Sequence, residues 1–136
     1  MKIEIVRKTK KRIERAFVEK IVKKTRAASG KRAGNFSVSV VFAGKEEIRR
    51  LNRKYRKKNK ATDVLSFDYS LGYNIRGSKN ITGEVILCPE IIEKSAKEHE
   101  ISFREELAFV LSHGILHLLG FRHGKKMYGI QEKISN

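Results

Sequence analysis

The chain has 136 residues, 40% of them hydrophobic and 34% charged, a mixture that excludes a disordered protein and fits one domain over residues 1–136. It carries 31 Lys and Arg against 15 Asp and Glu, a net charge of +16, and its longest apolar runs are too short for a membrane span. Cys88, the single cysteine, excludes an internal disulfide, and the start of the chain lacks the pattern of a secretory signal. We therefore expect a cytoplasmic protein.

The positive charge is concentrated in the first part of the chain. Residues 1–60 hold 22 Lys and Arg and 5 Asp and Glu, whereas residues 61–136 hold 9 and 10. A field of this sign attracts polyanions, and counterion release on phosphate binding favours nucleic acid as the partner. The alternative is a solvated, lysine-rich surface of a stable protein.

Strands and helices alternate in the first half of the sequence. Apolar and polar residues alternate over 2–7 and over 36–42, which predicts two strands. An apolar residue at every fourth position predicts an amphipathic helix over 10–28. A turn at Gly44 then leads into a short helix predicted over 45–52.

The second half predicts two more strands and three helices. The strands cover 63–67 and 81–87, and the segment 71–79 between them contains two glycines and an asparagine, as a mobile loop does. Helices are predicted over 90–99 after Pro89, from the capping box of Ser102 and Glu105 to about Leu119, and over 126–134. This order predicts an α/β (α+β) fold with one small mixed four-stranded sheet and about five helices.

Three of the four histidines, His113, His117 and His123, lie close together in the sequence. Residues i and i+4 share one face of a helix, so the first two present their imidazoles together. Gly120 ends the helix and lets the chain turn back, which allows His123 to add a third nitrogen. Three neutral imidazoles leave a tetrahedral Zn²⁺ one open position, the usual arrangement of a catalytic zinc site. We therefore predict one Zn²⁺ per chain on the C-terminal part of the long helix.

This spacing also matches the H-E-x-x-H-x-x-G-x-x-H motif of metzincin proteases, with one difference. In those enzymes the Glu after the first His is the general base that activates water. Here the position is occupied by Gly114, which has no side chain. A zinc peptidase is therefore the weaker interpretation.

The same residues resemble the YbeY family, bacterial endoribonucleases also called rRNA maturation factors. The family motif H-G-x-L-H-L-x-G-[YF]-x-H appears as HGILHLLGFRH at 113–123. A second block, L-N-x-x-Y-R followed by T-D-V-L-S-F, appears at 51–56 and 62–67. The similarity is strong in these blocks and loose before residue 50.

The resemblance implies a metal-dependent endoribonuclease that is specific for single-stranded RNA. It implies a role in maturing the 3′ end of small-subunit (16S) rRNA and in ribosome quality control, with the ribosome or its proteins as partners. It also implies zinc on the three histidines, catalysis by these and by Arg56, and a cleft, basic on one side, between the sheet and the zinc helix. The chain departs from the family at Arg122, where Asp is usual.

Arg56 lies in a basic run from residue 49 to residue 60. An arginine engages two phosphoryl oxygens at once, which suits a clamp on the transition state. A contact with the RNA backbone that takes no part in catalysis is the alternative. The neighbouring cations in this run that we expect to bind RNA are Arg53, Lys57, Lys58 and Lys60.

Several other residues have two interpretations each. Asp63 is expected to cap a turn rather than to act as a base. Glu106 lies two helical turns before the first histidine, and its two interpretations are a substitute for the missing Asp and a solvated helix residue. We expect the second. Three aromatic residues could stack on unpaired bases, namely Tyr55, Phe67 and Tyr69. Aromatic residues in or beside strands more often belong to the core, so we expect these three to be core residues.

Three functions therefore compete. We favour a zinc endoribonuclease that acts on rRNA. The first alternative is a zinc hydrolase of another substrate, such as a peptide, and the second is a ribosome-associated RNA-binding module with structural zinc. A fourth protein ligand, for which Cys88 is the obvious soft candidate, would favour the last of these.

Overall fold

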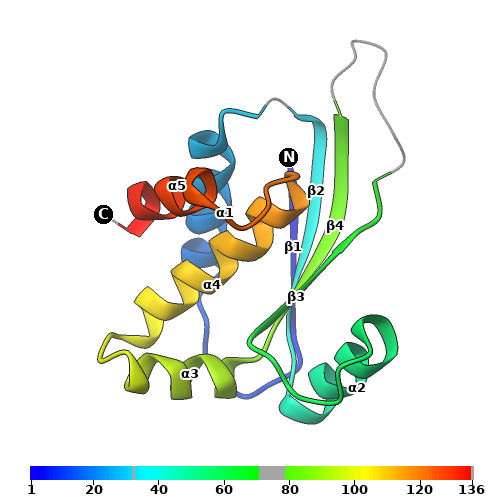
Figure 1. Cartoon of the computed structure of the whole chain (residues 1–136), viewed down its shortest axis with the longest axis vertical. Coiled ribbons are helices and arrows are strands. Elements are labelled where there is room, and N and C mark those ends of the chain that lie inside the picture. Colours follow the sequence, from blue (N-terminus) through cyan, green and yellow to red (C-terminus); the bar gives the residue numbers. More distant parts are fainter. Residues whose placement is uncertain (32, 71–78, 136) are drawn as a thin grey trace.

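The computed structural model describes residues 1–31, 33–70 and 79–135. The elements are β1 (Lys2–Arg7), α1 (Arg15–Ser29), β2 (Ala33–Phe42), α2 (Lys45–Arg56), β3 (Val64–Asp68), β4 (Lys79–Leu87), α3 (Pro89–Glu98), α4 (Phe103–Leu118) and α5 (Lys125–Ser135) (Figure 1). The mixed four-stranded sheet and the five helices predicted from the sequence are confirmed. The loop predicted over 71–79 lies, up to residue 78, outside the described residues.

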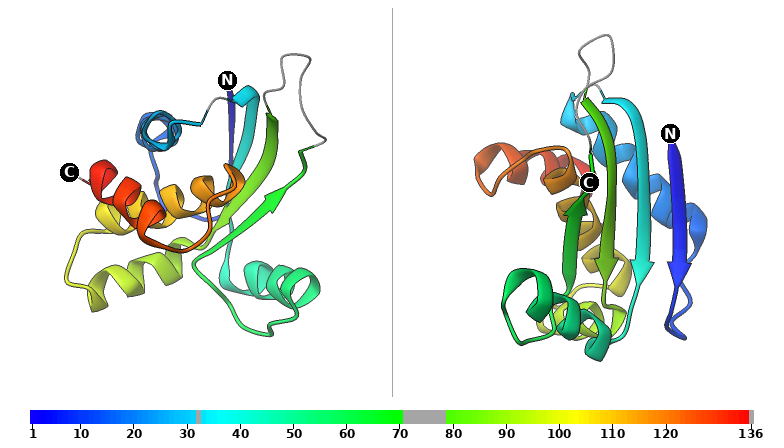
Figure 2. Two further views of the ribbon diagram at one scale, coloured as in Figure 1. Left: turned by 45° about the horizontal axis from the view of Figure 1, so that its top comes forward. Right: turned by 90° about the vertical axis from the view of Figure 1, so that its right-hand side faces the viewer.

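The strands are arranged in the order β1-β2-β4-β3, as the right-hand view of Figure 2 shows. Strands β1 and β4 run parallel to β2, whereas β3 runs antiparallel to β4. Strand β3 is therefore an edge strand, and it pairs Ser66 with Val85. Its edge position matters because β3 forms one wall of the site described below.

Both faces of the sheet are covered by helices. One face packs against α1, α4 and α5 around a large cluster that includes Phe36, Val40 and Leu111. The other face packs against α2 around a smaller cluster that includes Ile48 and Leu65. Figure 1 shows α2 on the opposite side of the sheet from α1, α4 and α5. Among the described residues, no helix is long and apolar enough to cross a membrane.

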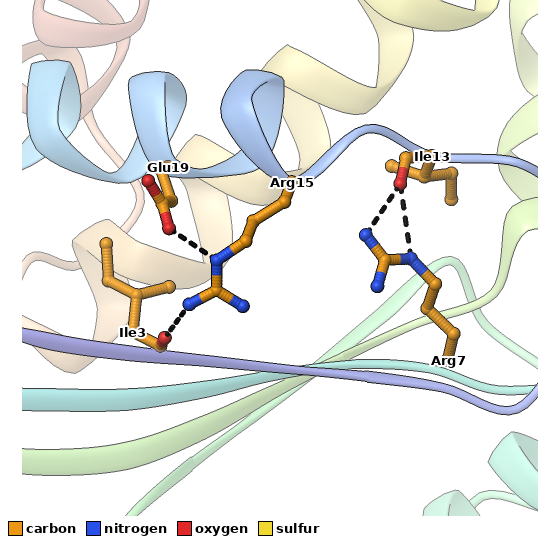
Figure 3. Close-up of polar contacts among 5 residues, drawn as sticks. All are labelled: Ile3, Arg7, Ile13, Arg15 and Glu19. Carbon is orange, nitrogen blue, oxygen red and sulfur yellow. Dashed lines mark hydrogen bonds and ion pairs between the residues drawn. The ribbon is translucent and has the colours of Figure 1, made fainter.

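Helix α1 begins at Arg15 and not at residue 10, where the sequence pattern placed its start. The Arg7 guanidinium donates to the Ile13 carbonyl at 2.9 and 3.2 Å, and Arg15 donates to the Ile3 carbonyl and to Glu19 (Figure 3). These bonds tie the extended segment before α1 to β1. A cluster of cations at a helix N-terminus also opposes the helix dipole, which explains the later start.

Helix α2 continues to Arg56, one turn beyond the predicted end at residue 52. The extra turn is basic, and cations are favourable at the C-terminal end of a helix. Lys57 then adopts a left-handed conformation with φ 58°, and the Asn52 side chain donates to the Lys60 carbonyl at 2.9 Å. The extra turn places Arg56 beside β3, where it enters the site.

Candidate metal centre and adjoining cavity

Helix α4 carries two of the three clustered histidines. Its start is fixed by the predicted capping box, in which Ser102 accepts from the Glu105 backbone and Glu105 accepts from the Ser102 backbone. The side chains that face the core are buried, namely Leu107, Leu111, Ile115 and Leu118. His113 and His117 lie on another stripe, where both are partly buried.

The third histidine arrives through a reversal of the chain after α4. Gly120 has φ +90°, a conformation that a residue without Cβ adopts at low cost. Its N–H donates to the His117 carbonyl at 3.0 Å. The Nε2 atoms of His117 and His123 then lie 3.0 and 2.9 Å from His113 Nε2.

These three imidazoles fit a metal ion. Their ligand atoms all lie within 4.8 Å of one another, and three ring nitrogens that converge without an acidic partner are stabilised by a shared cation. Zn–N bonds of about 2.05 Å at tetrahedral angles separate the nitrogens by roughly 3.3 Å, close to the distances observed. The predicted ligands are thus brought together, and the geometry is compatible with a metal site.

The surroundings of the rings favour the neutral, metal-binding form. Burial, together with the neighbouring His117 and His123, lowers the pKa of His113 to about 4. Burial also lowers the pKa of His117. A hydrogen bond to the Phe121 carbonyl at 3.1 Å raises this pKa in part, but burial has the larger effect. That bond uses Nδ1 and leaves Nε2 with its lone pair toward the cluster. The Gln131 side chain acts in the opposite direction and raises the pKa of His113.

Other predicted candidates lie outside this cluster. Cys88 is buried in the core cluster on the α2 face and is not among the grouped donors of the described residues, so it offers no fourth ligand. Asp63 accepts from the Thr62 hydroxyl at 3.3 Å, a local contact typical of a turn.

The expectation that Glu106 is solvated was wrong. Its residue exposure is only 4%, and its carboxylate contacts His99 Nδ1 at 3.1 Å. Helix α3 and strand β3 both pack on α4, which encloses this side chain between elements that are distant in the sequence. Glu106 is therefore buried and bonded to His99, and it is not among the donors grouped with the three histidines in the described residues.

Gly114 is required by the close approach of α4 to the sheet. A Cβ there would lie 2.7 Å from Val85 Cγ1, 3.1 Å from Ser66 Oγ and 3.3 Å from Val64 Cγ2. The Ser66 hydroxyl also donates to the Gly114 carbonyl at 3.0 Å. The position has no room for the glutamate of a metzincin, which gives a structural reason to set the peptidase aside.

Replacing Gly114 with Ala is expected to lower the free energy of unfolding. Overpacking costs about 1–3 kcal/mol, more than the gain of up to about 1 kcal/mol from the better helix propensity of Ala. Urea unfolding measures the difference. Gly129→Ala is the matched control on α5, where a Cβ meets nothing within 4 Å, and it should be neutral or stabilising. Equal stability of both variants would mean that α4 shifts freely on the sheet.

A cavity of about 640 Å³ opens beside the histidines. It lies between β3 and α4, where the resemblance implies a cleft, and its lining includes Arg56, Ser66, Phe67, His113 and His117. Arg56 Nη2 donates to the Ser66 carbonyl at 2.7 Å, and its guanidinium lies 5.0 Å from the centre of the Phe67 ring. Arg56 and two histidines of the candidate metal centre therefore line the same cavity.

Ser66 is a residue of the candidate site that sequence reasoning did not single out. Its carbonyl holds Arg56 and its hydroxyl holds the backbone of α4. A signal existed, because Ser66 is a polar residue between Leu65 and Phe67, and strand alternation places it on the opposite face of the sheet from these two neighbours.

The remaining predicted RNA-binding residues are exposed but do not line this cavity. Arg53 lines a separate hollow of about 580 Å³ on α2, together with Arg49, Arg50 and Asn59. The three predicted lysines, Lys57, Lys58 and Lys60, follow the C-terminal end of α2. The acidic Glu46 and Glu47 also line the hollow on α2, and all four predicted RNA-binding cations lie outside the cavity beside the histidines.

Of the three aromatic residues expected in the core, Tyr55 and Tyr69 are exposed instead, whereas Phe67 packs against the core cluster on the α2 face. Tyr55 and Tyr69 are 52% and 54% exposed, and Phe67 is partly buried between them. Tyr69 directly follows β3, where its N–H donates to the Thr82 carbonyl at 2.7 Å, and Tyr55 lies on the exposed last turn of α2.

Comparisons with known proteins agree with this picture. The sequence model of the family described as Endoribonuclease YbeY matches residues 2–136. The endoribonuclease YbeY of Thermosipho melanesiensis is 34% identical over 131 residues, which cover 92% of this chain and 88% of that protein. The endoribonuclease YbeY of Bdellovibrio bacteriovorus is 39% identical over 101 residues, 70% of this chain and 63% of that protein.

A solved structure shows the same fold. The solution structure of a Thermotoga maritima protein matches with a TM-score of 0.64 and 31% sequence identity. The match covers 98% of this chain and 86% of the Thermotoga maritima chain. Because the family match spans nearly the whole sequence and includes the segment that carries His113, His117 and His123, this chain belongs to the YbeY family of metal-dependent endoribonucleases.

Proposed function

We propose that this chain is a zinc-dependent endoribonuclease that cleaves single-stranded RNA. Its proposed substrate is the precursor of 16S rRNA, in 3′-end maturation and ribosome quality control in the cytoplasm, with the ribosome or its proteins as partners. The observation that carries the proposal is the cavity that Arg56 shares with His113 and His117. Family membership and the net charge of +16 support RNA as the substrate.

The proposed zinc ligands are His113, His117 and His123, with one ion per chain. An all-imidazole donor set suits Zn²⁺. When bound, zinc acts as a Lewis acid and lowers the pKa of water to roughly 7. The protein contributes orientation, because the Phe121 carbonyl fixes the ring of His117. His123 is exposed, so solvent and substrate reach this side of the cluster.

Arg56 is proposed to hold the phosphate that is cleaved. The Ser66 carbonyl holds one end of the guanidinium, and the ring of Phe67 supports its plane. Within the described residues Arg56 makes no second hydrogen bond, so its other N–H groups serve a phosphate in the cavity. A fixed planar donor stabilises the charge that develops on the phosphoryl oxygens.

The decisive test combines metal analysis with RNA cleavage. The purified protein is expected to hold about one Zn²⁺ per chain and to cut an unpaired RNA, while the same sequence in a duplex remains intact. Removal of the metal by a chelator should stop cleavage, and added Zn²⁺ should restore it. A zinc-loaded protein that cleaves neither RNA would leave a binding module with structural zinc as the function.

Neutralising Lys57, Lys58 and Lys60 together is expected to weaken RNA binding for all sequences alike. Each phosphate contact with a single strand contributes about 0.7 to the slope of log affinity against log salt, so the slope should flatten by up to about 2. Fluorescence anisotropy over a salt series measures it. A triple substitution elsewhere is the control, at the exposed positions Lys94, Lys97 and Lys133. Equal slopes for the two triple variants would place the RNA on another surface.

A further inference from the structure

Three aromatic side chains contact one another beside the cavity, and two of them, Phe67 and Tyr69, line it. The rings of Phe67 and Tyr69 have planes within 9° of each other and centres 6.5 Å apart, so their faces point in the same direction. The Tyr55 ring meets Phe67 edge to face at 5.3 Å. We call Tyr55, Phe67 and Tyr69 the aromatic platform.

The packing of the protein does not account for the platform. Phe67 contacts the core cluster on the α2 face, but Tyr55 and Tyr69 each leave about half of their surface in solvent. The Tyr69 hydroxyl contacts Glu84 at 3.3 Å, at an exposed position where such a bond adds little stability. Rings that stay exposed side by side are typical of a binding surface.

Cations surround the platform. The Arg56 guanidinium lies over the Phe67 ring at 5.0 Å, and Lys54 Nζ lies 5.2 Å from the centre of the Tyr55 ring. Ring faces beside positive charges match a strand that alternates bases with phosphates. An apolar peptide would leave these cations without a partner, so charge favours nucleic acid as the occupant.

The platform also lies within reach of the reaction site. Phe67 and Tyr69 line the same cavity as His113 and His117, and Arg56, which also lines it, lies over the Phe67 ring. A phosphate held by Arg56 therefore places its adjoining nucleotide against these rings. In a duplex the faces of that base are covered by its stacked neighbours and are not accessible to a side chain.

We propose that the aromatic platform stacks an unpaired base next to the phosphate held by Arg56, and that this contact selects single-stranded over duplex RNA. The inference rests on the proposed RNA cleavage and adds the residues that recognise the unpaired state. Tyr69 makes the main contact, because it is the more exposed of the two rings in the cavity. Phe67 supports both Tyr69 and Arg56.

The test uses Tyr69→Leu, which keeps the apolar character and removes the aromatic face. Its affinity for a short unpaired RNA, measured by stopped-flow anisotropy before cleavage proceeds, is expected to fall about tenfold. The zinc content and the salt slope should not change, because no ligand or phosphate contact is lost. Tyr69→Phe should bind within about twofold of wild type. The control is Tyr128→Leu, since Tyr128 is 51% exposed on α5 and does not line the cavity.

A set of RNAs with one abasic ribose at each position in turn makes the test specific for stacking. Wild type should lose affinity most strongly at one position, and Tyr69→Leu should lose nothing further there. In single-turnover cleavage the variant should need more enzyme for half-saturation and should reach the same plateau rate. The duplex should bind wild type and variant alike.

The outcomes separate the two proposals. If wild type binds and cuts unpaired RNA and Tyr69→Leu matches it, the platform proposal is overturned and the proposed function stands. An equal loss for duplex and single strand also overturns it, because stacking on an unpaired base cannot weaken duplex binding. If wild type neither binds nor cuts RNA, both proposals fail.

Discussion

Replacing His117 with Ala is expected to remove most of the zinc from the protein. The wild type should hold about one Zn²⁺ per chain, and the variant should retain a small fraction after dialysis against metal-free buffer. The physical reason is that His113, His117 and His123 are the donors grouped by the fold, so the loss of one leaves two imidazoles. Elemental analysis of the purified variants measures the ratio.

His99→Ala is the matched control for this experiment. His99 is the fourth histidine of the sequence, and it is not among the grouped donors. Its Nδ1 lies 3.1 Å from the Glu106 carboxylate. This variant should keep its zinc, which shows that the loss is specific to the cluster. Circular dichroism should give both variants the helix content of wild type. Near-stoichiometric zinc in a folded His117→Ala variant would contradict the assignment of His117 as a ligand.

The fold was predictable where its signals are local. The start of α4 follows from Ser102 and Glu105, three residues apart, and the turn after it follows from Gly120. The face shared by His113 and His117 depends on helix geometry alone. Each of these features is set within one or two helical turns, so no knowledge of the rest of the chain is needed.

The parts that were mispredicted depend on contacts between distant segments. Glu106 is buried because α3 and β3 close over α4. The late start of α1 depends on Arg7 in β1, and the exposure of Tyr69 depends on its place just after an edge strand of the sheet. Composition and periodicity carry no information on which surfaces remain uncovered after the layers pack. For this reason the grouping of the three histidines was easier to predict than the exposure of the side chains beside the cavity.

Replacing Arg56 with Ala is expected to lower kcat by on the order of 10²-fold, or about 2.7 kcal/mol of transition-state stabilisation, while RNA affinity changes little. The Ser66 carbonyl already holds the Arg56 guanidinium in place. The remaining N–H groups of the guanidinium therefore need little reorganisation to stabilise the negative charge that develops on the phosphoryl oxygens. Single-turnover cleavage of a short unpaired RNA, at saturating enzyme and fixed salt, measures the effect.

Arg56→Lys is expected to rescue poorly, because an ammonium on a single atom cannot bond the Ser66 carbonyl and span two phosphoryl oxygens in one plane. Arg53→Ala provides the comparison one helical turn earlier, at a position that lines a different hollow. It should weaken binding modestly and leave the plateau rate intact, as a backbone contact does. Zinc content should be normal in all three variants, since a guanidinium does not ligate metal at neutral pH. A plateau rate for Arg56→Ala within a few-fold of wild type would place Arg56 with Arg53 among the phosphate contacts and leave the histidine cluster as the catalytic element.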